Sequence, residues 1–307
     1  MSILEPSEKG NPYFARHEEQ RSSMLLGSSH FWRRRIGSAF AYVALFAVCG
    51  WMLLPIVWAF SSSLKPLDEV YAIPPKFTVG DCQGSNYLQV ITQLPFGRMV
   101  LNSTWISVIS AAGAVLTSSM AGFALAYGKF RGRGACFALV LVSLIVPTQG
   151  LFVTRYLLFA ELGWIDTYKP LIVPAWLGGG AFNVFLFRQF LRGIPRSYLE
   201  AACLDGATPW QFYWYVLLPS IRPAVVTAGL LSFVFHWHEF LDPLMYLSDL
   251  RQYPVSLGLR MLQSQSGTWM NLLMAASLIA LVPIVLVFVL CEWQVIRGLE
   301  AVGRPIK

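Results

Sequence analysis

Six long stretches of mostly apolar residues, each free of Lys, Arg, Asp and Glu, recur along the sequence. A transmembrane helix needs about 20 predominantly apolar residues. The pattern therefore predicts an all-α integral membrane protein with six transmembrane helices. The stretches cover residues 36–64, 99–128, 134–154, 170–187, 223–238 and 270–291. The fifth is long enough to span a bilayer only if it continues through Glu239 and Asp242.

Helix-breaking residues lie inside several of these stretches. Pro147, Pro174 and Pro283 interrupt the third, fourth and sixth, and Gly178–Gly180 loosens the fourth. Proline at membrane depth removes a backbone hydrogen bond, so we expect kinked helices that pack on protein or a water-lined cavity. This favours a transporter with moving helices. The alternative is that membrane helices simply tolerate Pro and Gly.

The composition agrees with a membrane protein. Hydrophobic residues are 56% and charged residues 13%, against about 25% charged in an ordinary soluble domain. The mean hydropathy is +0.55. Such a chain must cover apolar surface with lipid, which excludes a disordered chain, a secreted mini-protein or a cytosolic enzyme. The net charge of +7 comes from basic residues at the ends of the apolar runs, which argues against a nucleic acid partner.

The distribution of Lys and Arg predicts the orientation in the membrane. Cytoplasmic loops of membrane proteins carry an excess of these residues. With the N-terminus inside, 16 of them fall on the cytoplasmic side and 7 on the other. The cytoplasmic set lies in the N-terminal tail, in 129–133, in 188–222 and at the C-terminus. The sequence therefore predicts that both termini are cytoplasmic.

This topology gives a simple domain organisation. Residues 1–35 form a polar cytoplasmic tail, whose first 29 residues we expect to be mostly disordered because they are rich in Ser, Glu and Arg. No cleavable signal peptide is expected, since about thirty polar residues precede the first apolar run. Residues 36–296 form the six-helix domain, and 297–307 a cytoplasmic C-terminal tail. The external segment 65–98 contains four prolines, which predicts turns rather than a domain.

The longest cytoplasmic segment between spans, residues 194–222, lies between the fourth and the fifth. Ser197 with Glu200 three residues later has the spacing of a capping box, so a short helix is expected over 198–204. Gly206 can end it in a left-handed conformation. Thr208 and Pro209 suit the start of a second short helix. Five aromatic residues follow between 210 and 215, and together with Ala201 and Ala202 they predict a docking surface for another protein.

These residues resemble a known family. Glu200-Ala201-Ala202, then Asp205-Gly206-Ala207, then Leu218-Pro219 are similar to the EAA loop of the permease subunits of binding-protein-dependent ABC importers. The Ile common before Leu-Pro in the family is Val216 here.

The resemblance covers most of the chain. Asn102-Ser103, Phe130-Arg131-Gly132, Ile145-Val146-Pro147, Leu162–Thr167 and Trp237–Leu244 look like the carbohydrate-uptake branch, and most like its maltose-type permease. Two positions differ, because the family usually has Asn at 238 and an apolar or aromatic residue at 242, where this chain has His and Asp. The C-terminal segment 297–303 matches the family only in part.

The resemblance implies a function and its partners. The EAA loop would be a coupling helix seated in a groove of a cytoplasmic ATPase, through Glu200, Ala201, Ala202, Asp205, Gly206, Ala207 and Pro219. The chain would bind no cofactor and would catalyse no reaction, since ATP and Mg²⁺ would bind the ATPase dimer. Its other partners would be a second homologous permease, an extracytoplasmic sugar-binding protein and membrane lipid. The location implied is the cytoplasmic (inner) membrane of a bacterium or archaeon.

The residues themselves show no nucleotide site in this chain. Gly122 to Lys129 is the nearest approach to the phosphate-binding pattern GxxxxGK[ST]. The pattern would need Gly at 123 and Ser or Thr at 130, where the sequence has Phe123 and Phe130.

A polar cluster at the end of the fifth span is the second candidate site. It contains His236, His238, Glu239 and Asp242. Ionisable residues in a membrane segment are costly and point to function. They could line the translocation path beside Trp237, form a gate or packing contact, or bind a metal. A metal fits least, because residues 236 and 238 point about 200° apart on a helix. Asn183 in the fourth span is a further candidate for the path.

Several functions compete. An importer permease for a sugar or oligosaccharide fits best, with a non-sugar solute such as a polyamine or phosphate ester as the alternative. An intramembrane metallohydrolase built on residues 238–242 and a proton-coupled secondary transporter are further alternatives. The secondary transporter would not need an aromatic helical segment between the fourth and fifth spans, and metal analysis of the purified chain would test the metallohydrolase.

Overall fold

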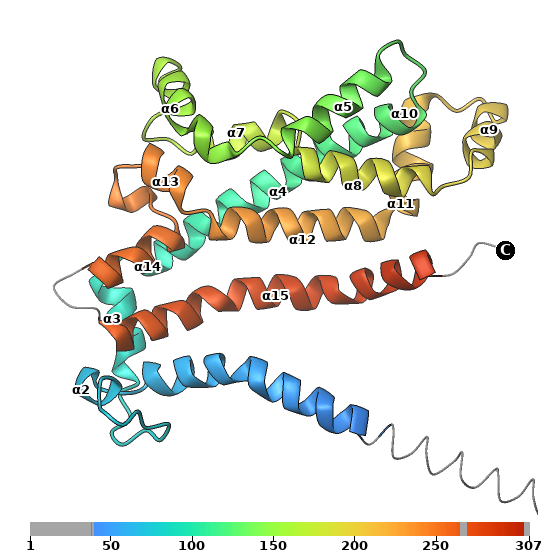
Figure 1. The fold of residues 1–307 in the computed structure, drawn as a ribbon. Helices are drawn as coiled ribbons and strands as arrows, with labels where there is room; N and C mark the ends of the chain where they lie inside the picture. The colour runs from blue at the N-terminus through green and yellow to red at the C-terminus, as the bar shows by residue number, and fades with distance from the viewer. Residues whose placement is uncertain (1–37, 39, 265–268, 304–307) are drawn as a thin grey trace, which may run out of the picture. The chain divides into compact units, whose positions relative to one another are not determined.

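The computed structural model describes residues 38, 40–264 and 269–303, and in these residues all the regular structure is helical (Figure 1). This agrees with the predicted all-α class. The predicted N-terminal tail, residues 1–35, lies outside the described residues. The C-terminal boundary predicted at 296–297 does not coincide with a helix end, because the last helix continues to Gly303.

Contacts divide the chain into two units, Met1–Trp58 and Ala59–Lys307. The described part of the first unit is helical. Its helix belongs to the segment Phe40–Ser63, which has a mean hydropathy of 2.2 and is long enough to cross a membrane. The first predicted span is therefore confirmed as a helix of membrane-spanning length.

The second unit contains the remaining helices, which are short except for α4, α12 and α15. Their bounds are α2 (Leu67–Val70), α3 (Ser85–Gln93), α4 (Phe96–Tyr127), α5 (Arg133–Ser143), η2 (Thr148–Leu151), α6 (Phe152–Glu161), α7 (Lys169–Trp176), α8 (Ala181–Arg192), α9 (Ser197–Leu204), α10 (Pro209–Gln211), η3 (Phe212–Leu217), α11 (Leu218–Ser220), α12 (Arg222–His238), α13 (Leu241–Tyr246), η4 (Leu250–Gln252), α14 (Val255–Ser264) and α15 (Met270–Gly303).

Helix α4 is the centre of this unit and packs against α12, α8 and α7. Its buried positions are mostly small, namely Ser103, Ser107, Ser110, Ala111, Gly113, Ala114, Ser118, Ser119 and Gly122. Small residues let helix backbones approach closely in a membrane. Gly122 shows this, since a side chain there would collide with Phe187 of α8. The sequence of α4 thus makes it the helix on which the others pack.

Four helical segments are long and apolar enough to cross a membrane: Phe40–Ser63, Phe96–Tyr127, Lys169–Arg192 and Met270–Gln294. They correspond to the predicted first, second, fourth and sixth spans. The fourth is broken into α7 and α8 at Gly178–Gly180, which all have positive φ. Pro283 lies inside α15, which continues past it as one helix.

The predicted third span, 134–154, is not one helix. Helix α5 ends at Ser143, and the chain resumes with η2 at Thr148 and α6 at Phe152. Pro147 gives the reason, because it has no N–H to donate to the carbonyl of Ser143 and disfavours a helical residue 146. With only 11 residues, α5 is too short to cross a bilayer alone.

The fifth predicted span differs from the observed helix at both ends. It was expected to continue through Glu239 and Asp242, but α12 ends at His238 and Glu239 is extended. A continuing helix would need residue 243 to donate to the carbonyl of Glu239, and Pro243 has no N–H. At the N-terminal end of α12, Pro209–Ser220 joins the helix at a bend of 80°. The bent pair is a fifth candidate span.

Candidate functional site

The segment 194–222 folds as a helix followed by a second, irregular helix. Helix α9, Ser197–Leu204, confirms the helix expected over 198–204. Gly206 follows with φ +76°, the left-handed conformation that glycine adopts without strain. The second helix begins at Pro209, as predicted, and passes through the π-helical turn η3 into α11. Pro219 lies at the start of α11. We call Ser197–Ser220 the coupling segment, after the role that the resemblance implies for it.

The capping box of this segment is not where the sequence pattern placed it. Ser197 was expected to cap the first helix with Glu200, but Arg196 is the N-cap and its side chain makes no capping bond. The capping box is formed by Thr208 and Gln211 at the second helix, where the Thr208 backbone N–H donates to Gln211 Oε1 at 2.8 Å. Thr208 with Gln211 has the same spacing as Ser197 with Glu200, so the pattern alone did not discriminate between them.

The predicted coupling residues divide into exposed and buried ones. Glu200, Ala201, Asp205, Gly206 and Pro219 are exposed, and Ala207 is half-buried. Ala202 is only 8% exposed and packs inside the chain. The alanine pair therefore faces two directions, with Ala201 available to a partner and Ala202 serving the internal packing.

A buried core joins the coupling segment to the membrane helices. Ala202, Phe212, Tyr213 and Leu217 pack in one cluster with residues of α8 and α12. On α4, the rings of Phe123 and Tyr127 lie 5.5–6.3 Å from those of Phe212 and Tyr213. A displacement of the coupling segment must therefore be transmitted to α4 and α8, since well-packed interiors deform little.

A buried hydrogen bond strengthens this connection. The hydroxyls of Ser119 on α4 and Tyr213 in η3 are 2.7 Å apart, and both side chains are almost fully buried. The sequence pattern identified the aromatic run 210–215 but not this pairing. The sequence signal for this pairing was weak. It consisted only of Tyr in place of Phe, since a buried Tyr needs a polar partner at the facing position and a buried Phe does not.

The outer face of the coupling segment is largely apolar. Leu204 is 89% exposed and Tyr215 is 79% exposed, and Tyr198 and Trp210 are both 55% exposed. Large apolar side chains gathered on one exposed segment indicate a surface for another protein. Docking of another protein on this surface, as expected from the sequence, stays a prediction.

The polar cluster predicted around residue 238 is divided between two environments. Trp237 and His238 line a cavity of about 520 Å³ between α12, α14 and α15. Phe240, Ser256, Arg260 and Gln263 are among its other lining residues. We call this the α12–α14–α15 cavity. Aromatic walls with a few polar groups are typical of small-molecule sites.

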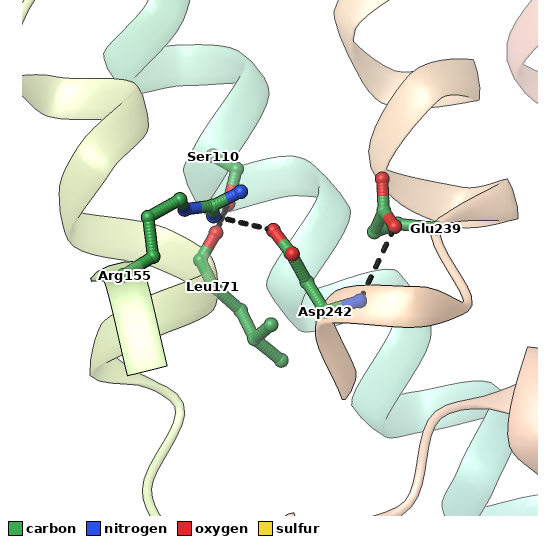
Figure 2. A network of polar contacts seen from close by, with 5 residues as sticks. All are labelled: Ser110, Arg155, Leu171, Glu239 and Asp242. Atoms are coloured by element: carbon green, nitrogen blue, oxygen red, sulfur yellow. Dashed lines mark hydrogen bonds and ion pairs between the residues drawn. The ribbon is translucent and has the colours of Figure 1, made fainter. Parts of the chain in front are cut away.

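Glu239 and Asp242 belong instead to a polar network at α13 (Figure 2). Arg155 Nη2 of α6 is 2.6 Å from Asp242 Oδ2, in an ion pair whose side chains are 28% and 17% exposed. The backbone N–H of Asp242 donates to Glu239 Oε1 at 3.4 Å. Figure 2 also shows the Ser110 hydroxyl of α4 donating to the carbonyl of Leu171 at 3.2 Å. The network joins α6 to α13, two helices far apart in the sequence.

Further contacts hold the same region together. Asp166, which has φ +55°, accepts a hydrogen bond from the backbone N–H of Ser248 at 2.6 Å. Its own backbone N–H donates to the carbonyl of Tyr246 at 2.8 Å. The Tyr246 ring packs edge-on against Phe159, and burial raises the pKa of its hydroxyl above the usual value. The segment that follows α6 is therefore fixed to the end of α13.

Asn183 is held inside the chain by two hydrogen bonds. Its Nδ2 donates to the carbonyl of Gly179 at 2.8 Å and to Ser232 Oγ of α12 at 2.9 Å. The side chain is 9% exposed and is not among the residues that line the α12–α14–α15 cavity. Asn183 therefore supports the break between α7 and α8, and these bonds occupy its amide.

The two histidines make the same local bond on different sides of α12. His236 Nδ1 lies 2.7 Å from the carbonyl of Ser232, and His238 Nδ1 lies 2.9 Å from that of Val234. Only His238 lines the cavity. Within the part of the chain that is described, no three His, Cys, Asp or Glu side chains come close enough to hold a metal ion.

We expect removal of one partner of the Arg155–Asp242 pair to destabilise the chain. Asp242 Oδ1 is buried and has no hydrogen-bond partner within the described residues, so the carboxylate depends on Arg155. Arg155→Gln or Asp242→Asn should each lower the free energy of unfolding by about 1–3 kcal/mol. The double variant should lose less than the sum of the two, as measured by denaturation in detergent. Strictly additive losses would show that the two side chains are not coupled.

The helices and their apolar candidate spans define a class of protein, the multi-span membrane protein. A crystal structure of a bacterial ABC transporter involved in the import of the acidic polysaccharide alginate has the same fold. Its chain superimposes with a TM-score of 0.69 at 21% identity, over 89% of this chain and 97% of that one.

Relatives and a family match lead from the class to the family. The arabinooligosaccharides transport system permease protein AraQ of Halalkalibacterium halodurans is 31% identical over 275 residues, which is 89% of this chain and 95% of the relative. The sn-glycerol-3-phosphate transport system permease protein UgpE of Brucella abortus is 29% identical over 80% of this chain and 89% of that protein. Residues 114–295 match the binding-protein-dependent transport system inner membrane component. The chain belongs to this family.

Family membership confirms several of the expectations from the sequence. The chain is a permease subunit of an ABC importer in the inner membrane, and it is not an enzyme. The match includes the whole coupling segment, the lining of the α12–α14–α15 cavity and the Arg155–Asp242 pair, since it extends from residue 114 to residue 295.

Proposed function

We propose that the chain is one of two homologous permeases of an importer that carries a sugar or oligosaccharide, driven by a separate ATPase dimer that binds ATP and Mg²⁺. An extracytoplasmic binding protein delivers the solute. The observation that carries the proposal is the coupling segment, whose exposed face meets solvent while its other face packs on α4 and α8. Such a segment can receive a movement on one side and transmit it on the other.

The proposed topology has six crossings with both termini cytoplasmic. The four apolar candidates and α12 supply five. The sixth is a broken crossing made by α5 and α6 on either side of Pro147. With 16 Lys and Arg on one side against 7, the coupling segment faces the cytoplasm. Residues 1–35 and 297–307 are then cytoplasmic.

The coupling residues have separate roles in this proposal. Glu200, Ala201 and Asp205 contact the ATPase, because they are exposed on or beside α9. Gly206, Ala207 and Pro219 set the turn and the entry into α11. Ala202 acts from inside by fixing α9 to the buried core.

The α12–α14–α15 cavity is the proposed part of the translocation path. Trp237 and Phe240 offer aromatic faces, and Ser256, Arg260 and Gln263 offer hydrogen-bond donors and acceptors. Glu239 and Asp242 act beside it as a gate contact, since the Ser256 hydroxyl that lines the cavity donates to the Glu239 carbonyl at 2.7 Å. The relatives named for an arabinooligosaccharide and for glycerol phosphate support a carbohydrate solute.

The test is solute uptake by the complete importer. We expect the chain purified from native membranes to bring with it a second permease and an ATPase, and to take up an oligosaccharide in proteoliposomes containing the binding protein. His238→Ala should raise the KM of uptake about threefold to tenfold, because it alters the cavity wall; a tenfold change is 1.4 kcal/mol of binding.

His236→Ala is the matched control. It also removes an imidazole bonded to a carbonyl four residues earlier, but one outside the cavity, so its KM should stay within about twofold of the wild type. An equal effect of both substitutions would contradict the assignment of the cavity. Purification without an ATPase, or uptake of polyamines alone, would contradict the proposed function.

A further inference from the structure

A second cavity of about 520 Å³ lies between α4, α5, α8 and the segment that precedes α8. Most of its lining is small or apolar, including Ala124 and Leu125 of α4, Cys136 and Val140 of α5, and Val184 of α8. We call it the α4–α5–α8 groove. It lies away from the α12–α14–α15 cavity, with which it shares no lining residue.

The length of α5 suits one leaflet of a bilayer. Its 11 residues span about 16 Å at 1.5 Å per residue. The hydrocarbon core of a bilayer is about 30 Å thick. The groove follows α5 from Cys136 to Ser143, and Pro147 then ends the helical path. An apolar groove along a helix of this length matches an acyl chain in a single leaflet.

Three arginines lie on α5 and α8 beyond the lining residues Cys136 and Val184. Arg133 and Phe137 are one turn apart on α5, and Arg188 and Arg192 are one turn apart on α8, so each pair shares a helix face. The guanidinium carbon of Arg188 lies 3.5 Å from the centre of the Phe137 ring, which brings the two faces together. Val184, on the same side of α8, continues from Arg188 into the groove.

Within the described parts of the chain, none of these three arginines forms an ion pair with a carboxylate. Among the same residues, Arg188 Nε is buried without a hydrogen-bond partner. Arg133 donates to the backbone carbonyl of Gly128 at 3.0 Å and, more weakly, to that of Ala126. The positive charges of Arg133 and Arg192 both act on Arg188. An anion would relieve this repulsion and occupy the free donors.

We propose that the groove binds an acyl chain of an anionic phospholipid, whose phosphate is held by Arg188 and Arg192 with Arg133 beside them. Charge complementarity identifies the head group, and the apolar groove that begins beside it identifies a lipid rather than a free anion. The location in the cytoplasmic leaflet rests on the proposed orientation of the permease. The site itself does not depend on what the importer carries.

The experiment measures lipid retention by the assembled importer, purified in mild detergent. The complex is incubated with phosphatidylglycerol, with phosphatidylcholine of the same acyl chains, or with inorganic phosphate, and bound molecules are counted by native mass spectrometry. We expect the wild type to retain phosphatidylglycerol at least tenfold better than phosphatidylcholine, which is about 1.4 kcal/mol. Inorganic phosphate should not displace it.

Two variants test the two halves of the site, and a third is the control. Arg188→Gln with Arg192→Gln removes the head-group donors, and Ala124→Trp fills the groove from an exposed position on α4. Each should lower the retention of phosphatidylglycerol about tenfold. Arg131→Gln with Arg222→Gln removes two exposed arginines outside the site and should leave retention unchanged.

Several results would overturn the proposal. One is equal retention of both lipids by the wild type, and another is unchanged retention in either test variant. Displacement by inorganic phosphate would indicate an anion site without a lipid. A cross-link from Cys136, which lines the groove, to the second permease would show that a protein covers it. Uptake is measured separately, so a failed transport assay leaves the lipid result intact, and the reverse.

Discussion

Ala201→Trp is expected to reduce solute uptake at least tenfold while leaving the permease folded. Ala201 is exposed on α9, so an indole there meets no crowding inside the chain. In the proposed complex the same face enters a groove of the ATPase, and the added bulk separates the two proteins. A small side chain lets a helix approach its partner closely, and Trp removes that property. The expected result is a normal melting temperature with less ATPase in the purified complex.

Ala202→Trp is the matched comparison, one residue further along the same helix. Ala202 packs in the cluster that holds Phe187, Leu191 and Phe212. Overpacking such a core costs about 1–3 kcal/mol, occasionally more. This variant should therefore lower the yield and the melting temperature of the permease before it affects coupling. Wild-type uptake by Ala201→Trp, measured in the same proteoliposomes, would remove the basis for an ATPase contact at α9.

The sequence predicted the coupling segment in unusual detail, because local rules determine it. A glycine with positive φ, a Thr-Pro helix start and a run of aromatic residues act over a few positions, and each was recognised. The capping box was assigned to Ser197 and Glu200 instead of Thr208 and Gln211. Both pairs have the correct spacing, and only the backbone conformation of residue 208, which is extended, distinguishes them.

The polar cluster at the end of α12 was harder to predict, because neighbours in sequence were assumed to share an environment. The helix ends at His238, so the chain turns between that residue and Glu239. Trp237 and His238 then face a cavity, while Asp242 meets Arg155, 87 residues away in the sequence. A long-range ion pair of this kind leaves no local pattern.

The same limit applies to the membrane spans. Hydropathy identified α4 and α15 because each is a long, uninterrupted helix. It joined α5 to the residues beyond Pro147, since apolar composition does not show where a backbone hydrogen bond is lost. Pro209–Ser220 was assigned to the docking surface, and its aromatic residues also make it apolar enough to form a bent candidate span together with α12.

Gly179→Ala is expected to have the largest effect on folding of any single methyl addition in the break between α7 and α8. Gly179 has φ +66°, and a Cβ atom there would overlap the backbone carbonyl oxygen of Ala114 on α4 and crowd the Ser118 side chain. A backbone atom cannot move aside like a flexible side chain. The strain of the left-handed conformation and the collision together should cost on the order of 3 kcal/mol or more.

Gly180→Ala separates the collision from the backbone strain. Gly180 also has a positive φ, +83°, with ψ 139°, but a Cβ there meets nothing within 4 Å. Its cost should be the strain alone, about 1–3 kcal/mol. Melting temperatures of the two variants in detergent should therefore differ, with Gly179→Ala the lower. If Gly180→Ala were equally damaging, strain would account for both, and the close approach of Gly179 to α4 would not be what fixes the broken span. A lower melting temperature for Gly179→Ala would instead show that the α7–α8 break lies too close to Ala114, 65 residues earlier in the chain, to accept a side chain.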